Sequence, residues 1–169
     1  VSDIKTIKTL KGEYKARTVI IATGASAAKL GIKGESELIG KGVSYCAVCD
    51  GAFYKDKTVA VIGGGNAAVE EGAYLTKFAK KVYIIHRRDE LRADKIVQER
   101  AFKNDKLEFI YDTVPLEINA NDEGCVGNLK VQNVKTKAIE DLAVDGVFPY
   151  IGFTPNVKDF SGQVMQDER

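Results

Sequence analysis

KTVAVIGGGNAA, residues 57–68, is the stretch that decides the fold. Its first half, residues 57–62, is a short apolar run stopped by three glycines, which is typical of a buried parallel strand. Residues 66–80 then carry apolar side chains at helical spacing among good helix formers, so we expect a helix there. The stretch therefore predicts a strand, a tight glycine turn and a helix in direct succession.

The glycine turn matches the pattern G-x-G-x-x-A. In that pattern Gly63 permits the tight turn, Gly65 lets the backbone approach a pyrophosphate, and Ala68 lets helix and strand pack closely. The amino end of the helix adds free N–H groups and partial positive charge. Glycine turns are common, but the strand–turn–helix context favours nucleotide binding over a plain turn. The candidate residues are Gly63, Gly64, Gly65, Asn66 and Ala67.

The remaining sequence extends this unit in both directions. Residues 3–25 predict a hairpin whose last strand, near 18–25, is buried at its end, and residues 26–42 predict an irregular linker. Further strands are expected at 81–86, 107–111 and 146–152, a second helix at 91–103, and three short antiparallel strands at 115–121, 126–134 and 138–144. This order predicts an α/β fold: a Rossmann-like NAD(P)-binding domain with a parallel sheet flanked by helices and an inserted antiparallel β-meander.

A basic cluster lies where the second strand of the domain ends. An NAD site has an acidic residue there for the ribose, whereas this chain has His86-Arg87-Arg88, with Arg92 one turn later. Arginines suit a dianionic 2′-phosphate because they donate forked, charge-assisted hydrogen bonds. A solvated basic face is the alternative, and the two acidic residues after Arg88 can pair with the arginines. The spacing from the glycine turn favours NADP(H), with His86 in a supporting place beside the adenosine.

A C-x-x-C motif, Cys46 to Cys49, precedes the glycine turn. Two intervening residues leave both sulfurs within disulfide reach, and such a pair exchanges with other thiols when one thiolate is stabilised. Asp50 follows at once and is a candidate proton carrier. Zinc needs four ligands, and Cys125 and the single histidine lack partner spacing, so we expect no metal. A zinc half-site completed by a second chain stays an alternative.

Together these segments resemble the low-molecular-weight, bacterial-type thioredoxin reductases. The order of cysteine pair, glycine turn and arginine cluster carries the resemblance, which spans nearly the whole chain. Its main segments are residues 18–25, 42–51, 63–71, 86–93 and 146–156.

The resemblance implies a mechanism and a set of roles. NADPH passes a hydride to FAD, the reduced flavin reduces the Cys46–Cys49 disulfide, and the dithiol reduces thioredoxin. It implies that Cys49 faces the flavin, that Cys46 attacks the partner disulfide, and that Asp50 donates a proton. The implied nucleotide ligands include His86, Arg87, Arg88, Arg92, Ile151 and Gly152.

Two departures from the family pattern limit the expectation. The sequence has no second glycine fingerprint for FAD, so we expect FAD only in the complete enzyme and no full turnover by this chain. Residues 1–28 are interpreted as the end of a first FAD-domain segment and a linker, 29–152 as the NADPH-binding domain, and 153–169 as the return to the FAD domain. The second departure is Ala67, which replaces a common Ser or Thr; one lost bond to a charged group costs ~1.5–3 kcal/mol.

The alternatives are the equivalent domain of an alkyl hydroperoxide reductase flavoprotein and a flavin-free nucleotide-binding redox module. Lys plus Arg number 25 and Asp plus Glu 24, which gives no global field toward nucleic acid. No apolar run approaches the ~20 residues that span a bilayer. Three cysteines fit a cytoplasmic protein with one redox function. Exposed apolar surface around Ile20, Ile21 and Phe153 is expected to drive homo-oligomer formation.

Overall fold

The structure is a computed structural model that describes residues 4–165, and the chain divides into two compact units. The smaller unit comprises the described parts of Val1–Ser26 and Thr154–Arg169. It contains the antiparallel hairpin of β1 (Lys5–Thr9) and β2 (Gly12–Ala16) and a short 3-10 helix, η2 (Lys158–Phe160). The strands β3 (Ala25–Ala27) and β11 (Phe153–Pro155) pair with each other.

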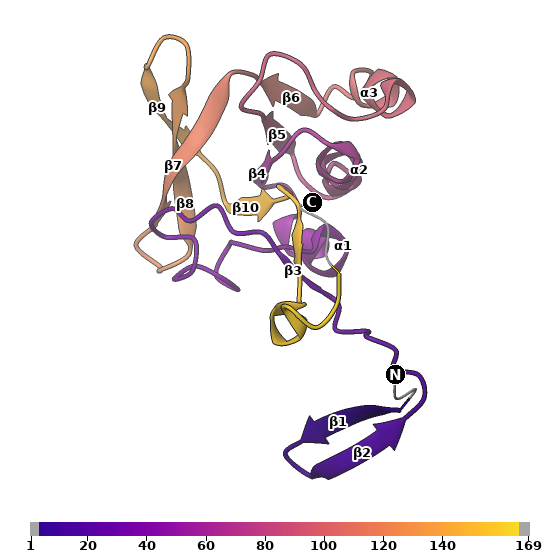
Figure 1. Cartoon of the computed structure of the whole chain (residues 1–169). Coiled ribbons are helices and arrows are strands. Elements are labelled where there is room, and N and C mark those ends of the chain that lie inside the picture. Colours follow the sequence, from indigo (N-terminus) through magenta and orange to yellow (C-terminus); the bar gives the residue numbers. More distant parts are fainter. Residues whose placement is uncertain (1–3, 166–169) are drawn as a thin grey trace. The chain divides into compact units, whose positions relative to one another are not determined.

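The larger unit, Ala27–Phe153, is built on a four-stranded parallel sheet. Its strand order is β10-β4-β5-β6, and every neighbouring pair is parallel (Figure 1). The strands are β4 (Thr58–Ile62), β5 (Lys81–Ile85), β6 (Leu107–Ile110) and β10 (Gly146–Pro149). From β4 the chain continues to β5 and β6 on one side, whereas β10, the last strand of the sheet, lies on the other side of β4. The strand order therefore reverses at β4.

Both faces of the sheet are covered, by different kinds of structure (Figure 1). Successive side chains of a strand point to opposite faces, so Val59 and Val61 pack into the helical core while Ala60 and Ile62 pack into the second core. The first face carries α1 (Ala47–Asp50), η1 (Gly51–Tyr54), α2 (Asn66–Leu75) and α3 (Lys95–Ala101). The second carries the antiparallel meander of β7 (Thr113–Ala120), β8 (Val126–Asn133) and β9 (Ile139–Ala143).

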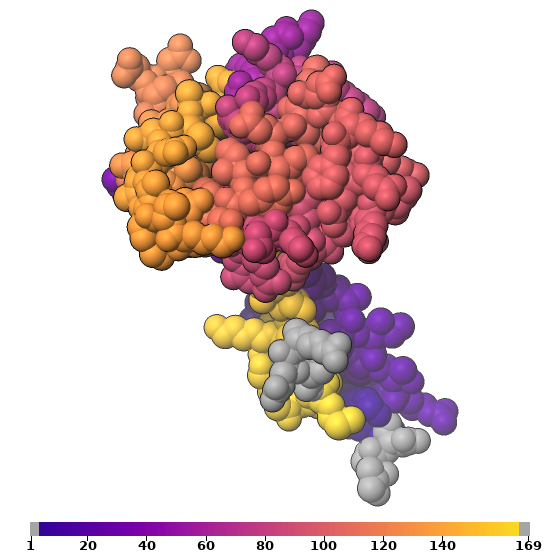
Figure 2. All heavy atoms as spheres, turned by 90° about the horizontal axis from the view of Figure 1, so that it is seen from above, coloured from indigo at the N-terminus to yellow at the C-terminus, as the bar shows by residue number. Residues whose placement is uncertain are grey.

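The predicted fold class is confirmed, with the meander covering the face that helices do not. Figure 2 shows the close packing of this unit, with the β8 and β9 region in orange along one side. No helix within residues 4–165 is long and apolar enough to cross a membrane.

The two predicted helices are shorter than expected. The first ends at Leu75, where the Thr76 hydroxyl donates to the carbonyl of Ala73. The second begins only at Lys95, because the N–H groups of Arg92 and Ala93 both donate to the carbonyl of Gly64. Residues 91–94 are therefore tied to the glycine turn and do not enter the helix.

The prediction of a buried strand near residues 18–25 was wrong. Residues 18–24 form no strand in the described part of the chain, and Ile20 is 88% exposed. An extended segment becomes a strand only where a neighbouring strand satisfies its backbone groups, and none of the described strands pairs with these residues.

Candidate functional site

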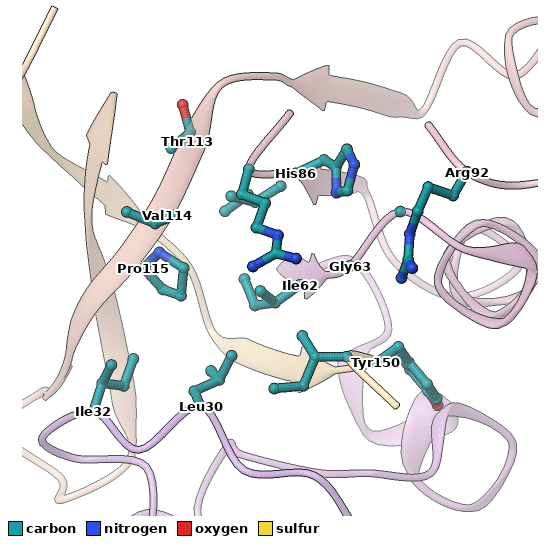
Figure 3. Close-up of a pocket in the computed structure, with 14 residues that line it drawn as sticks. Leu30, Ile32, Ile62, Gly63, His86, Arg92, Thr113, Val114, Pro115 and Tyr150 are labelled. Atoms are coloured by element: carbon teal, nitrogen blue, oxygen red, sulfur yellow. The ribbon is translucent and has the colours of Figure 1, made fainter. Parts of the chain in front are cut away.

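A cleft of about 370 Å³ opens at the carboxyl edge of the parallel sheet (Figure 3). Residues that immediately follow β4, β5 and β10 line it: Gly63, His86 and Tyr150. The start of β7 and the irregular segment near residue 30 supply its apolar wall. In open α/β sheets ligands bind outside the carboxyl ends of the strands where the strand order reverses, and this cleft occupies that place.

The three glycines of the turn have different surroundings. Gly63 has a φ of 152°, and a Cβ there would lie 2.4 Å from the carbonyl oxygen of Tyr150 and 2.8 Å from the Cβ of Ala68. A Cβ on Gly64 would lie 2.4 Å from Nδ1 of His86. A Cβ on Gly65, which caps the amino end of α2, meets no atom within 4 Å. The first two glycines are needed for packing, and Gly65 leaves open space beside the helix terminus.

His86 is buried against this turn, with 5% of its surface exposed. Its Nε2 is buried and has no hydrogen-bond partner within the described residues. Burial lowers the pKa of the imidazole, and Arg92, Arg88 and Arg87 lower it further, against a backbone hydrogen bond with Glu90 that raises it. The ring is therefore held in its neutral form beside a cluster of cations.

The three arginines are available to a ligand. None of them forms an ion pair with a carboxylate in the part of the chain that the structure describes. All three are exposed; Arg87 and Arg92 line the cleft, whereas Arg88 does not. Asp89, one of the two acidic residues that the sequence offered as partners for the arginines, pairs with Lys135 at 3.3 Å.

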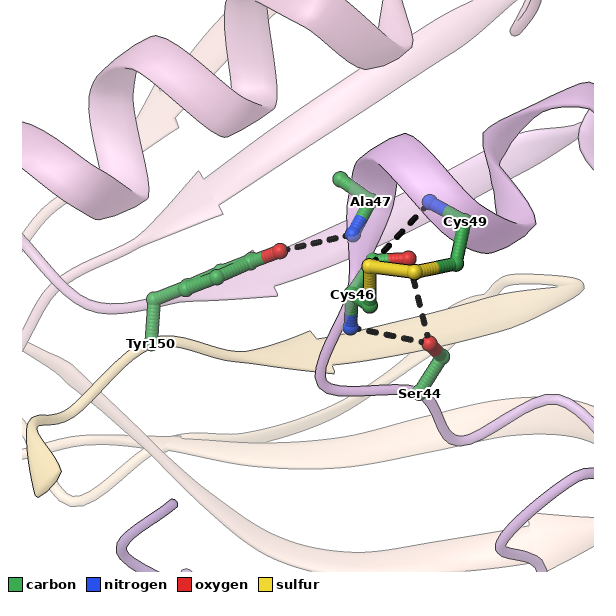
Figure 4. The surroundings of a disulfide bond; sticks show 5 residues. All are labelled: Ser44, Cys46, Ala47, Cys49 and Tyr150. Carbon is green, nitrogen blue, oxygen red and sulfur yellow. Dashed lines mark hydrogen bonds between the residues drawn. A yellow bond between two sulfur atoms is a disulfide. The ribbon is translucent and has the colours of Figure 1, made fainter. Parts of the chain in front are cut away.

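The cysteine pair forms a disulfide at the start of α1 (Figure 4). The Cys46 sulfur accepts the backbone N–H of Cys49 at 3.1 Å, and the Ser44 hydroxyl accepts the N–H of Cys46 at 3.1 Å. Cys49 is exposed and Cys46 is half-buried. The third cysteine, Cys125, is free and exposed, and no group of metal-ligating side chains occurs within residues 4–165.

A hydrogen bond connects the disulfide segment to the cleft. The Tyr150 hydroxyl accepts the N–H of Ala47 at 2.8 Å (Figure 4), and Tyr150 is one of the residues that line the cleft. A buried carboxylate makes a second connection: Glu35 accepts the N–H groups of Leu30 and Gly31 and the hydroxyl of Tyr45, each at 2.8 Å. The apolar wall and the cysteine segment are thereby fixed to one another.

The structure brings part of the predicted set together. Gly63, Gly64, His86, Arg87, Arg92 and Ile151 line the cleft, and Gly65, Asn66, Ala67, Arg88, Gly152, Cys46, Cys49 and Asp50 lie outside its lining. The side chain of Asn66 is occupied by Asp94, in two hydrogen bonds of 2.7 Å.

Some residues that line the cleft were not predicted from the sequence. Thr113, Val114 and Pro115 follow the end of the third parallel strand, a signal that was present because such ends meet at one edge of a sheet. Tyr150 follows the last strand in the same way. Leu30 and Ile32 lie in an irregular segment, where no periodic pattern identifies them.

Comparison with known proteins identifies the family of this chain. The sequence model of the pyridine nucleotide-disulphide oxidoreductases matches residues 2–169. The chain belongs to this family.

Relatives within the family are more specific. Thioredoxin reductase of Bacillus subtilis (strain 168) is 51% identical over 166 residues, which are 98% of this chain and 52% of the relative. Thioredoxin reductase of Listeria innocua is 49% identical over the same shares. The crystal structure of Lactococcus lactis thioredoxin reductase superposes with a TM-score of 0.92 at 47% identity, over 99% of this chain and 55% of that one.

The chain therefore spans about half the length of the thioredoxin reductases it matches. The predicted resemblance is confirmed by these similarities, and the Cys46–Cys49 disulfide occurs where the resemblance expects the redox pair.

Proposed function

We propose that this chain is the NADPH-binding, dithiol-carrying part of a thioredoxin reductase, with FAD held by the remainder of the complete enzyme. The observation that carries the proposal is the contact between the two sites: the tyrosine that lines the nucleotide cleft also binds the cysteine segment through Ala47. In the complete enzyme, NADPH and FAD would supply the two electrons that open the disulfide.

The residues of the cleft fit NADP(H). Gly65 leaves room beside the amino end of α2, where backbone N–H groups favour a pyrophosphate. Arg87 and Arg92 line the cleft and have no carboxylate partners among the residues that the structure describes, which suits a 2′-phosphate. The Nε2 of His86, which has no hydrogen-bond partner among residues 4–165, offers one more polar atom to a bound adenosine. Arg88, Ile151 and Gly152 complete the nucleotide ligands that we propose.

The dithiol would act by thiol–disulfide exchange. The Cys46 thiolate attacks one sulfur of the thioredoxin disulfide, and the other thioredoxin sulfur leaves as a thiolate. Cys49 then attacks the Cys46 sulfur, which re-forms the internal disulfide and releases the second thiolate; the two thioredoxin thiolates take up protons, with Asp50 as the nearby donor. The N–H of Cys49 at the Cys46 sulfur stabilises negative charge on the attacking atom.

Titration calorimetry at low salt with NADPH and with NADH tests the nucleotide assignment. We expect NADPH to bind more tightly, and the Arg87→Ala/Arg88→Ala variant to lose that preference. Arg100→Ala, an exposed arginine at the end of α3, is the matched control and should bind as the parent chain does. Equal affinities for the two nucleotides, or no binding of either, would overturn the assignment.

The dithiol assignment has an independent test. The reduced chain is mixed with oxidised thioredoxin and the products are separated on non-reducing gels. The Cys49→Ser variant should trap a mixed disulfide through Cys46, and Cys46→Ser should trap none. The opposite pattern would exchange the two roles.

We further propose a cytoplasmic location and self-association of the chain. Ile20 is 88% exposed in the smaller unit, and Phe153 is 66% exposed in the larger one. Exposed apolar side chains of this size favour partners. Light scattering should give a mass that rises with concentration; a constant monomer mass would exclude self-association.

A further inference from the structure

A cluster of three charged side chains lies beside the arginine segment and outside the cleft. Lys135, in the turn between β8 and β9, contacts Asp112 at 2.9 Å and Asp89 at 3.3 Å. Asp89 directly follows Arg87 and Arg88 in the sequence. The meander, inserted between β6 and β10, thus sends a cation to the segment that carries the candidate 2′-phosphate ligands.

The turn that presents Lys135 is well defined. The Asn133 side chain accepts the N–H groups of Lys135 and Thr136, each at 2.9 Å, and the Asn133 carbonyl accepts the N–H of Lys137 at 2.9 Å. The N–H of Val134 donates to the carbonyl of Asp112 at 2.6 Å. These bonds hold the start of the Lys135 side chain beside Asp112.

The other end of the cluster is joined to the arginine segment. The N–H of Asp112 donates to the carbonyl of Arg88 at 3.1 Å, and the next residue, Thr113, donates to the carbonyl of His86 at 2.9 Å. Asp112 has a positive φ of 51°, a conformation that directs the chain from β6 into β7 at this point. The segment is therefore held through its backbone as well as through Asp89.

The charge balance indicates what the cluster does. A carboxylate next to two arginines competes with any phosphate for their N–H groups, because both offer oxygen acceptors to the same donors. In the structure Asp89 is paired with Lys135, and the arginines have no carboxylate partner in the described residues. The hydrogen bond to Lys135 also lowers the pKa of Asp89, which keeps it charged and engaged.

We propose that Lys135 is a positioning residue for NADPH selectivity: it withdraws Asp89 from the arginines and so leaves them free for the 2′-phosphate. The inference rests on the proposed nucleotide site. It concerns only the interaction that distinguishes NADPH from NADH, since NADH lacks the 2′-phosphate that competes with Asp89 for the arginines.

A double-mutant cycle read by calorimetry tests the inference. Lys135→Met should weaken NADPH binding by about threefold to fivefold, the scale of one exposed ion pair, and leave NADH binding unchanged. Lys135→Arg should restore the affinity. In the Asp89→Asn background Lys135→Met should have no effect, because the competing carboxylate is gone. Lys137→Met removes a charge from the same turn and should bind NADPH as the parent does.

The outcomes separate this inference from the proposed function. An equal loss of NADPH affinity with and without Asp89 would mean that Lys135 acts by its own charge, and would overturn the positioning role. An equal loss for NADH, or no loss at all in a chain that prefers NADPH, would overturn it as well. Failure of the parent chain to prefer NADPH would overturn the proposed nucleotide site, and this inference with it.

Discussion

The Tyr150 hydroxyl accepts the backbone N–H of Ala47 at 2.8 Å, and this bond joins the last strand of the parallel sheet to the helix that carries the cysteine pair. Ala47 is fully buried, so no solvent replaces the acceptor. Burial also raises the pKa of Tyr150. A single residue thus lines the cleft and, through its side chain, fixes the amino end of α1.

Tyr150→Phe should destabilise the chain by about 1–3 kcal/mol, because it leaves a buried N–H without an acceptor. Denaturant unfolding followed by circular dichroism measures the change. Tyr14→Phe, at an exposed tyrosine in β2, is the matched control and should change stability little. Equal stabilities for Tyr150→Phe and the parent chain would show that the bond contributes nothing.

The glycine turn offers a pair of substitutions with opposite expected effects. Gly64→Ala drives a methyl group into the His86 ring and should cost about 1–3 kcal/mol of stability by overpacking. Gly65→Ala meets open space at a φ of −89°, which alanine adopts freely, so the fold should keep its stability. NADPH affinity should nevertheless fall in Gly65→Ala, since the methyl group occupies the approach to the helix terminus.

Denaturation and calorimetry on the two variants check this contrast. A Gly65→Ala chain that binds NADPH as tightly as the parent would contradict the placement of the pyrophosphate at this turn. A Gly64→Ala chain of unchanged stability would show that His86 moves aside without cost.

The sequence predicted the central unit well because its signals are local. The apolar run of β4, the three glycines after it and the start of α2 follow one another, and each of these signals predicts its own structure: a strand, a tight turn and a helix. The cleft wall was harder, because Leu30 reaches it only through the hydrogen bonds of its segment to the buried Glu35. The packing role of Gly64 was also missed: Gly64 was predicted only as a nucleotide-binding residue, and the packing of His86, which follows β5, makes glycine necessary there.

Stability should depend on His86 at mildly acid pH. Its pKa is lowered in the folded chain, first by burial and then by the nearby arginines, so the unfolded chain binds more protons below about pH 6.5. The contribution of His86 is therefore complete above about pH 6.5 and is lost as the pH falls through the lowered pKa.

Denaturant midpoints measured from about pH 8 down to about pH 5, above the main titration of carboxylates, test this dependence. His86 is the only histidine, so a His86→Asn variant should show a flatter profile whatever its absolute stability. Parallel profiles for the variant and the parent chain would assign the pH dependence to other groups.

Replacing Ala67 with serine should strengthen nucleotide binding. It is exposed in the first turn of α2, close in sequence to Gly65, where we propose that the pyrophosphate binds. Ala67→Ser should tighten NADPH and NADH binding by the same factor, about tenfold to a hundredfold, because the pyrophosphate is common to both nucleotides and one hydrogen bond to a charged group is added. Calorimetry with both nucleotides measures the two factors.

Ala52→Ser, at an exposed alanine in η1, controls for a general effect of the added hydroxyl. A gain for NADPH alone would place the new hydroxyl at the 2′-phosphate instead, and no gain for either would mean that the pyrophosphate lies away from the first turn of α2.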